Sequence, residues 1–392
     1  MVKITFVGDI MCQKQLLPIY QTTQGYDFNE IFEGTKEFFG ESDLVIGNLE
    51  TPISKEPSEY TTQKYNFSSP YEFAEAVYES GIKCVATANN HCLDRGIGGL
   101  DRTIQYLDEI GILHTGTYKS EKEKKPLIIE AKDMKIGVLS YTYGTNAFSN
   151  HNYLNRKNKY KVNLFQNQEL SNPITRFCYH HRNIVTRVYN KLMRIIFREK
   201  VDCQVYERKE NDLLCKRRLL KEIKQIKEAG AEIIVMCMHA GGQYNKEPLK
   251  STKKLSRFLL KHGVNIIAGS HEHVVHDGEF DEINENKIST YSLGNYCTVY
   301  GLYEEPYDEM ANYSIAWNVY VDNENSKINK TTFSVLKTVE TERKGIQTVL
   351  LYDLINKEKD EEKRKNLIED MKKIAYKFAK IEYKEIQKEY QI

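Results

Sequence analysis

The chain has 392 residues, 28% of them charged, and its 56 Lys and Arg nearly balance 55 Asp and Glu, so the net charge is +1. The 27 Tyr and 15 Phe, with no repetitive or Pro/Gly-rich tract, argue against a disordered or fibrous protein. No window approaches the roughly 18 apolar residues of a membrane span, and the apolar N-terminal stretch is too short for a signal peptide. We therefore expect a globular cytoplasmic protein of one large domain or two ordinary ones.

The cysteines are scattered along the chain and form no C-x-x-C pair. They are Cys12, Cys84, Cys92, Cys178, Cys203, Cys215, Cys237 and Cys297. Without a secretory signal we expect reduced thiols, mostly buried in or near strands, and no zinc site built from cysteine.

Short β-branched runs alternate with stretches whose apolar residues recur at helical spacing. The expected strands are Ile4–Val7, Leu44–Ile46, Cys84–Ala86, Ile136–Ser140, Ile233–Met238, Ile266–Ala268 and Thr290–Leu293. The helical spacing falls at 73–78, 100–107, 219–226 and 255–259, and the helices are followed by Gly81, Gly111, Gly230 and Gly263, which suit a left-handed helix end. This alternation predicts an α/β layered core with helices on the faces of the sheet.

Two segments depart from that alternation. Residues 151–218 carry 16 Lys or Arg against 6 Asp or Glu, and an apolar stripe beside basic residues at 182–198 predicts a basic amphipathic helix. We expect this helix to pack on the core with a solvated basic face; the alternatives are a lid that attracts an anionic substrate and a helix on a membrane surface. After residue 311 the chain is β-rich, and a charged helix is expected from about Lys357 to the end. The late strands are expected at Tyr313–Val321, Thr331–Thr338 and Gln347–Leu351.

Polar side chains cluster directly after the predicted strands, where open α/β sheets place their ligands. They are Asp9, Glu50, Asn90, His91, Asp94, His239, His271, His273 and Asn295. Imidazole nitrogens, carboxylates and an amide oxygen suit Zn, Mn or Fe, and the absence of a Cys ligand argues against a soft structural site. These ligands exceed the needs of one tetrahedral ion, whereas two ions about 3.5–4 Å apart that share a carboxylate would use them. A single ion stays open as the alternative.

Six motifs, in this order and spacing, carry a resemblance to a known family. They are Gly8-Asp9-Ile10-Met11, Asn48-Leu49-Glu50-Thr51-Pro52, Ala88-Asn89-Asn90-His91-Cys92-Leu93-Asp94-Arg95-Gly96, His239-Ala240-Gly241-Gly242-Gln243-Tyr244, Ser270-His271-Glu272-His273-Val274 and Tyr291-Ser292-Leu293-Gly294-Asn295. Over roughly residues 1–300 the chain resembles the CapA (PgsA) family of poly-γ-glutamate capsule biosynthesis proteins, which is similar in turn to the calcineurin-like metallophosphoesterases.

The resemblance implies a fold and its divisions. We expect a layered metallophosphoesterase-like β-sandwich flanked by helices, with a basic helical insertion at 166–212. The CapA-like domain would span 1–310. Residues 311–392 would form a β-rich extension of the same domain that ends in the charged helix.

The resemblance also implies metal ligands. Asp9 and His273 would bind the first ion, and Glu50 takes the place of the usual bridging aspartate. The ligands of the second ion would be Asn90, His239 and His271. The motif departs from the family at Met11, where phosphoesterases usually carry the His of Asp-x-His, so the first ion could be weakly held.

Further residues could serve proton transfer, which the resemblance assigns to His91, and contact with substrate. His91 would protonate the leaving group or stabilise charge, with Asp94 either fixing its tautomer or serving as a turn residue. Arg95 and Tyr244 could hold an anionic group, and each fits a packing role equally well. Asn295 would contact a ligand or support its loop.

The leading expectation is a metal-dependent, phosphoesterase-like hydrolase with one or two divalent ions (Mn, Zn or Fe). It would act on an anionic small molecule or polymer, such as poly-γ-glutamate, in capsule or cell-envelope biosynthesis. The alternative is a non-catalytic capsule-assembly or polymer-binding protein with a degenerate metal site, which Met11 favours. Nucleic acid is not an expected partner because no aromatic stacking platform is recognisable.

Overall fold

The computed structural model describes residues 1–62, 65–168, 213–280, 283–300, 302, 308 and 310–392. The basic insertion expected at 166–212 lies outside the described residues from 169 onward, and so does the helix expected at 182–198.

Nine strands form the first sheet, in which β1 is central. The path is β18 (Ile346–Leu350), β17 (Ile328–Glu340), β16 (Tyr313–Val321), β1 (Val2–Ile10), β4 (Leu44–Leu49), β7 (Cys84–Ala86) and β8 (Leu113–Thr115), with β15 (Asn295–Cys297) beside β1 and β19 (Tyr390–Gln391) beside β17. The strands β1, β4, β7 and β8 run parallel, and β16 to β18 continue the sheet in antiparallel order. The late part of the chain therefore completes the sheet that the N-terminus begins.

Six strands form the second sheet, whose middle is parallel. The order is β13 (Gly278–Glu279), β14 (Ile288–Thr290), β12 (Ile266–Ser270), β11 (Ile233–His239), β10 (Met134–Thr142) and β9 (Leu127–Ala131). The strands β10, β11, β12 and β14 run parallel, and β9 and β13 are antiparallel edges. Two short pairs lie apart: β2 (Gln21–Thr22) with β3 (Gly25–Tyr26), and β5 (Ile53–Ser54) with β6 (Ser69–Pro70).

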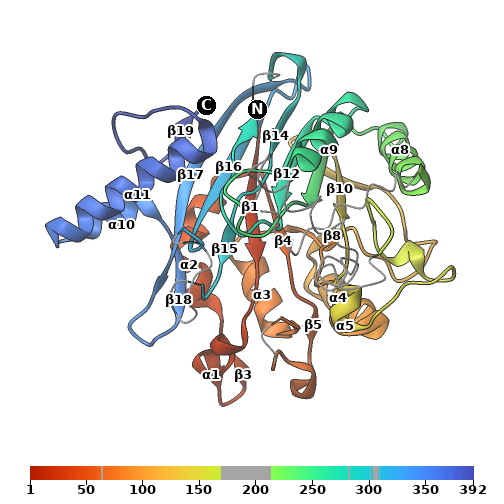
Figure 1. The fold of residues 1–392 in the computed structure, drawn as a ribbon, viewed down its shortest axis with the longest axis horizontal. Helices are drawn as coiled ribbons and strands as arrows, with labels where there is room; N and C mark the ends of the chain where they lie inside the picture. Colours follow the sequence, from red (N-terminus) through yellow and green to blue (C-terminus); the bar gives the residue numbers. More distant parts are fainter. Residues whose placement is uncertain (63–64, 169–212, 281–282, 301, 303–307, 309) are drawn as a thin grey trace, which may run out of the picture.

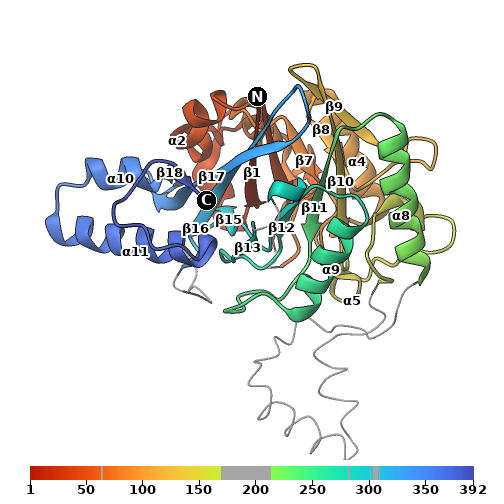
Figure 2. The ribbon, with the colours of Figure 1, turned by 90° about the horizontal axis from the view of Figure 1, so that it is seen from above.

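Alternate residues of a strand face opposite sides of its sheet, and this sorts the core into layers. Phe6 and Val235, from different sheets, share one apolar cluster between the sheets. Val45 packs with residues of α2 (Asn29–Gly40), α3 (Tyr71–Glu79) and α4 (Gly96–Ile110), and Met236 with residues of α8 (Leu213–Glu228) and α9 (Lys250–Lys261). The expected layered sandwich of sheets flanked by helices is confirmed; Figure 2 shows α2 and α9 on opposite sides of the strands.

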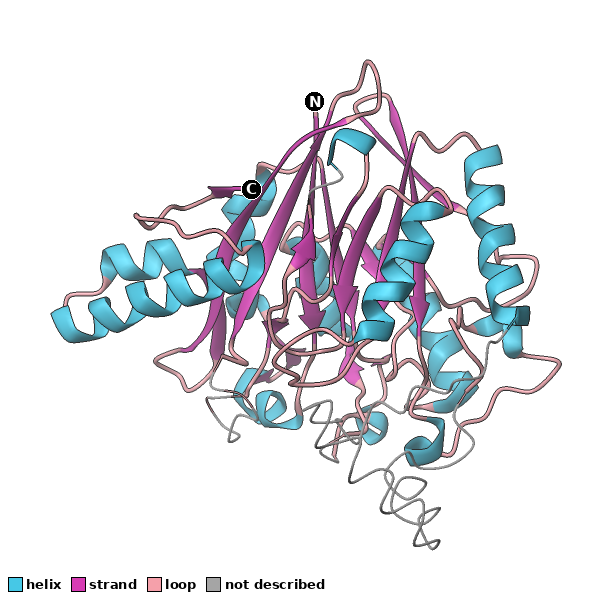
Figure 3. Cartoon of the chain, turned by 45° about the horizontal axis from the view of Figure 1, so that its top comes forward, coloured by secondary structure: helices cyan, strands magenta, loops and turns pink. Residues whose placement is uncertain are grey.

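The first sheet extends beyond the second, and two C-terminal helices cover it there. Phe378 of α11 (Glu361–Ala379) packs against Phe333 of β17 with ring centroids 4.9 Å apart, and α10 (Leu351–Lys357) joins the same cluster. In Figures 1 and 3 these helices project from one side of the strands. The short helices α1 (Leu17–Tyr20) and α5 (Ala147–Asn150) lie in loops. None of the helices in the described ranges is both long and apolar enough to cross a membrane.

The local signals for helices are confirmed, and two predicted boundaries are wrong. Gly81, Gly111, Gly230 and Gly263 all have positive φ. The strand expected at Thr290–Leu293 ends at Thr290, because the chain then turns through Gly294 (φ +78°) to enter the first sheet as β15. The last helix ends at Ala379, where Lys380 is left-handed, and the chain returns so that Tyr390 stacks on Phe333. The six described cysteines are free and buried, as expected.

Candidate metal centre

The parallel strands of both sheets end at one edge, and the polar side chains singled out above gather there. Asp9 lies at the end of β1, Glu50 follows β4, His239 ends β11, and His271 follows β12. The backbone N–H of His271 donates to Asp9 Oδ2 at 3.2 Å, which joins the second sheet to the first. Gly8 lets the turn at Gly294 lie close against β1, since a Cβ there would lie 1.8 Å from the carbonyl oxygen of Gly294.

Two groups of buried ligands share one carboxylate. Asp9, Glu50 and His273 form the first group, and Glu50, His239 and His271 the second; within each, the potential ligand atoms lie within 4.8 Å of one another. These five residues are buried, each at most 4% exposed. Since carboxylate and imidazole ligands suit divalent Zn, Mn or Fe, each group could hold a metal ion. Glu50 belongs to both groups, which is what a bridging ligand requires.

The first group is held by amide side chains. Asn48 Nδ2 donates to Asp9 Oδ1 at 2.7 Å. His273 Nδ1 lies 3.2 Å from Asp9 Oδ2 and 2.9 Å from Asn295 Oδ1. Asn295 Nδ2 donates to the carbonyl oxygen of His273 at 3.1 Å, so this buried amide holds both the ring and the backbone of His273.

The second group contains ligand atoms with no protein partner. His239 Nε2 lies 2.8 Å from Asn90 Oδ1 and 3.5 Å from Glu50 Oε1, and its Nδ1 lies 3.0 Å from Ser270 Oγ. Both ring nitrogens of His271, and Glu50 Oε1, are buried without a hydrogen bond in the described part of the chain. Buried polar atoms normally have a partner, so these atoms fit a divalent ion.

The protonation of the centre also fits a cation. Burial, followed by the neighbouring Asp9, raises the pKa of Glu50 well above its ordinary value. Burial and the other histidines lower the pKa values of His239 and His271 well below their usual range. The two histidines are therefore neutral near pH 7, the form in which imidazole binds a metal.

His271 and His273 lie on a strained loop after β12, and contacts of the Glu272 side chain hold this loop in place. His271 and His273 have φ values of +97° and +58°, which non-glycine residues seldom adopt. The fully buried Glu272 between them accepts from the N–H of Gly242 at 3.2 Å and contacts His276 Nδ1. These contacts join the loop after β11 to the loop after β12. They fix His271 and His273 relative to His239 at the end of β11.

His91 lies beside the centre and is oriented by Asp94. His91 Nδ1 lies 2.7 Å from Asp94 Oδ2, and both side chains are buried. The same carboxylate accepts from the N–H of Phe67 at 2.8 Å, and the Phe67 ring packs on His91 with centroids 4.5 Å apart. A carboxylate bound to Nδ1 favours a proton on Nδ1 and fixes the plane of the ring.

Arg95 holds a neighbouring loop, whereas Tyr244 lies beside the candidate metal centre. The Arg95 guanidinium donates to carbonyl oxygens of the loop at 59–66, with Nε 2.7 Å from the oxygen of Glu59, and burial lowers its pKa. This geometry favours a packing role for Arg95 over contact with substrate. Tyr244 lies against the metal centre, with its ring centroid 5.6 Å from that of His273.

Met11 is buried in an apolar cluster. It is 1% exposed and belongs to an apolar cluster with Phe67, Tyr300 and Ala311, against which Tyr244 packs. Its carbonyl oxygen accepts from the Cys297 thiol at 3.3 Å. The position that carries a His in the phosphoesterase motif therefore contributes an apolar wall.

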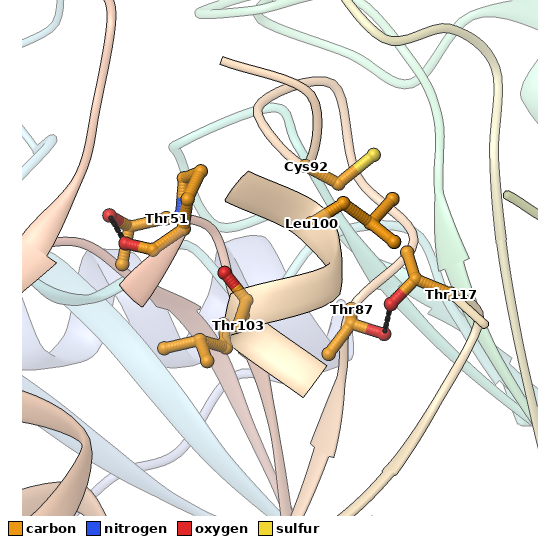
Figure 4. Close-up of a pocket in the computed structure, with 8 residues that line it drawn as sticks. Thr51, Thr87, Cys92, Leu100, Thr103 and Thr117 are labelled. Atoms are coloured by element: carbon orange, nitrogen blue, oxygen red, sulfur yellow. Dashed lines mark hydrogen bonds between the residues drawn. The ribbon is translucent and has the colours of Figure 1, made fainter. Parts of the chain in front are cut away.

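A small pocket lies behind the centre, between α4 and the ends of β4 and β7 (Figure 4). Its lining residues include four threonines, of which Thr87 and Thr117 share a hydrogen bond of 2.8 Å. The volume of about 10 Å³ is room for about one water molecule. This pocket is too small for a substrate.

The sequence reading missed three residues that shape the centre. The Asn48 amide lies within 3.4 Å of Asp9, Glu50 and His239, and Ser270 orients His239. Tyr143, which follows β10, lies 4.6 Å from His271 between ring centroids. Asn48 and Ser270 stand in motifs quoted above, and Tyr143 lies three residues beyond the strand predicted at Ile136–Ser140.

Comparisons with known proteins place the chain in a family. It is 23% identical over 75% of its length to the capsule biosynthesis protein CapA of Bacillus anthracis, and 23% identical over 74% to the PGA biosynthesis protein CapA of Bacillus subtilis. It spans 59% and 62% of the length of these two relatives. A solved structure of the sulfate thiohydrolase SoxB of Thermus thermophilus matches 87% of this chain and 45% of its own with a TM-score of 0.39 and 9% identity. The model of the family described as bacterial capsule synthesis protein PGA_cap matches residues 3–300. The chain therefore belongs to this family of bacterial capsule synthesis proteins.

Proposed function

We propose that the chain is a metal-dependent hydrolase with a two-ion centre that acts on an anionic substrate in capsule or cell-envelope polymer biosynthesis. The observation that carries the proposal is that Glu50 belongs to two buried ligand groups at once. Asp9 and His273 would complete the first site, and His239, His271 and Asn90 the second. The unpartnered nitrogens of His271 and Glu50 Oε1 support this assignment.

The residues of the chain would hold the ions, orient the substrate and supply a proton. Divalent ions bound at such a centre supply Lewis acidity toward an ester or amide oxygen and ionise water near neutral pH. His91 would protonate the leaving group from its imidazolium form: Asp94 would accept from Nδ1–H and stabilise the charged ring, and Nε2–H would give its proton to the leaving group. Phe67 shields the His91–Asp94 pair from water on one face.

The substrate would be an anion related to capsule polymer. The relatives named above are described as capsule and PGA biosynthesis proteins, which supports a polymer such as poly-γ-glutamate or a precursor of it. Tyr244 is the best-placed of the predicted substrate-binding residues, because its ring lies at the His273 side of the centre.

Elemental analysis of protein purified without chelator tests the proposal first. We expect about two equivalents of Mn, Fe or Zn per chain, and hydrolysis of a phosphoester or γ-glutamyl amide in the presence of that ion. His91→Gln should lower turnover at least about a hundredfold, the usual size of acid–base catalysis, with no loss of metal. His262→Ala, at an exposed histidine after α9, is the matched control and should change neither. A chain that takes up no metal on reconstitution would refute the hydrolase.

The second candidate is a non-catalytic assembly or polymer-binding protein whose metal site is degenerate. The packing of Met11 into an apolar cluster favours it, because the first site then has one ligand fewer than the phosphoesterase motif supplies. This candidate predicts one equivalent of metal or less, polymer binding that chelator does not abolish, and no turnover.

A further inference from the structure

The two outer helical layers of the sandwich carry opposite charge. The helices α8 and α9 together hold eleven Lys or Arg against two Glu, a net of +9. The helices α2, α3 and α4, on the far side of the sandwich, hold nine Asp or Glu against two Lys or Arg, a net of −7. The whole chain has a net charge of only +1. These two helical layers therefore present surfaces of opposite charge.

The basic charge forms one continuous surface. The helices α8 and α9 pack side by side on the second sheet: residues of both share one apolar cluster, and Lys216 Nζ lies 5.7 Å from the centroid of the Phe258 ring. Figures 1 and 2 show the two helices together on the outside of the molecule. The exposed cations are Arg217, Lys221, Lys224, Lys227, Lys250, Lys254, Arg257 and Lys261. We call this surface the basic layer.

Within the described residues, few carboxylates neutralise the basic layer. Lys224 pairs with Glu228 and Arg257 with Glu279. Among the described residues no carboxylate lies within salt-bridge distance of Arg217, Lys221 or Lys254, and neither helix has an acidic residue in its first turn. Lys250 stands at the start of α9, where the helix dipole disfavours a cation. The cations without a carboxylate partner point to an anionic partner.

The basic layer also has an exposed apolar side chain. Leu214, in the first turn of α8, is 62% exposed, the most of any large apolar residue in the described ranges. Arg217 and Arg218 lie one turn further along the same helix. Cations beside an exposed leucine on a helix surface are the combination that binds the headgroup region of an anionic bilayer, where the cations meet phosphates and the leucine enters the acyl boundary.

We propose that the basic layer docks the protein onto an anionic lipid bilayer. A bilayer is an extended charged plane, and a molecule with one basic and one acidic layer orients on such a plane with the acidic layer away from it. The cations are spread over two helices rather than aligned in a groove, which favours a plane over a single polymer strand. Because α9 follows β11 and leads into β12, its first turn lies at the edge that carries His239 and His271, so docking brings the metal centre near the lipid surface. The proposal does not depend on catalysis.

Sedimentation with vesicles tests the proposal on the full chain. Vesicles of phosphatidylglycerol and phosphatidylcholine in equal parts should bind the protein, and vesicles of phosphatidylcholine alone should not. The variant Arg217→Glu/Lys221→Glu/Lys254→Glu should bind the anionic vesicles at least roughly a hundredfold more weakly, since each cation near an anionic surface strengthens binding about fivefold and the three factors multiply. Leu214→Ser should cause a smaller, few-fold loss that persists at high salt.

The control has the same change of net charge on another surface. Lys363→Glu/Lys365→Glu/Lys372→Glu alters three exposed lysines of α11 and should bind the vesicles like the unaltered chain. An equal loss in this control would overturn the proposal, because net charge alone would then explain binding. So would failure of the unaltered protein to sediment with anionic vesicles. Inorganic polyphosphate serves as a soluble polyanion: if the reversed variant lost binding to it and kept binding to vesicles, the basic layer would be a polymer site and the proposal wrong.

Discussion

The two ligand groups of the centre share Glu50 but differ in how the protein holds them. In the first, Asp9 and His273 are tied by hydrogen bonds to Asn48 and Asn295. In the second, His271 has no hydrogen bond to either ring nitrogen in the described residues. The first group is rich in carboxylate and the second in imidazole. The first is thus arranged before a metal arrives, whereas the second leaves strong ligand atoms unsatisfied until it does.

The largest effect is expected where the two groups meet. Glu50→Gln removes the shared carboxylate and should reduce bound metal from about two equivalents to none, with turnover down at least about a thousandfold, because Lewis-acid stabilisation is worth several kcal/mol. Elemental analysis and a turnover assay measure both. If this variant kept one tightly bound ion, Glu50 would belong to one group only.

Single histidine variants separate the groups. His271→Ala should remove the second ion and leave the first, and His273→Ala should do the reverse, each leaving about one equivalent. Isothermal titration with Mn²⁺ or Zn²⁺ on chelator-treated protein reports the stoichiometry of each variant. The comparison breaks down if either substitution removes both ions while the circular dichroism spectrum stays unchanged.

Supporting residues give a matched pair of smaller effects. Ser270→Ala removes one hydrogen-bond partner of His239, and Asn295→Ala removes one hydrogen-bond partner of His273. Such outer partners are worth about 10–100-fold in metal affinity. We expect Ser270→Ala to weaken the second ion alone, and Asn295→Ala the first. Equal weakening of both ions in both variants would show that these residues support the fold as a whole.

The pH dependence of metal affinity follows from the carboxylate shared by both groups. The pKa of Glu50 in the metal-free chain is raised well above 4.5, so protons compete with the ions as pH falls through that raised value. The pKa values of His239 and His271 lie well below 6.5, so these rings stay neutral through that pH and do not compete. The rise in Tm on adding metal should therefore shrink with acid, with affinity falling about tenfold per pH unit. Thermal unfolding at pH 8, 7, 6 and 5 checks this; a constant rise in Tm would contradict it.

Met11→His should change metal content least. The side chain at this position packs among Phe67, Tyr300 and Ala311, so an imidazole there is buried without a ligand role and costs about 1–3 kcal/mol of stability. Chemical denaturation measures that cost, and elemental analysis should still give about two equivalents. A gain of metal instead would favour the degenerate-site candidate, since a missing ligand would then be what limits the first ion.

The site was more predictable from the sequence than the arrangement of the strands. Parallel strands end at one edge of a sheet, so Asp9, Glu50 and His239 could be expected to meet before any sheet order was known. The crossing of the chain between the sheets at Gly294 could not, because Thr290–Leu293 has the composition of an uninterrupted strand and the turn depends on where β1 lies. The contacts of Asn48 could not be predicted either, because the sequence does not show which groups a buried amide will meet in the folded chain.

The sequence predicts the end of α4 but not the end of α11. The end of α4 could be predicted because it carries Gly111, and glycine is the residue type that adopts a φ of +87° without strain. Lys380 ends α11 in the left-handed region although lysine has no preference for it. The helix ends there because the chain turns back so that Tyr390 stacks on Phe333. This contact lies far along the chain from Lys380, so the residues around Lys380 do not predict it.

The position of β16 has a consequence for how the protein can be divided. The family match ends at residue 300, yet β1 pairs along Val2–Phe6 with β16, which begins at Tyr313. A fragment cut at the family boundary would turn the central strand of the first sheet into a bare edge and uncover Phe6, whose ring packs on Trp317 at 5.3 Å. Exposed edge strands with apolar faces recruit other chains. The residues from Tyr313 onward therefore protect the edge of β1, and a fragment made for expression should include them.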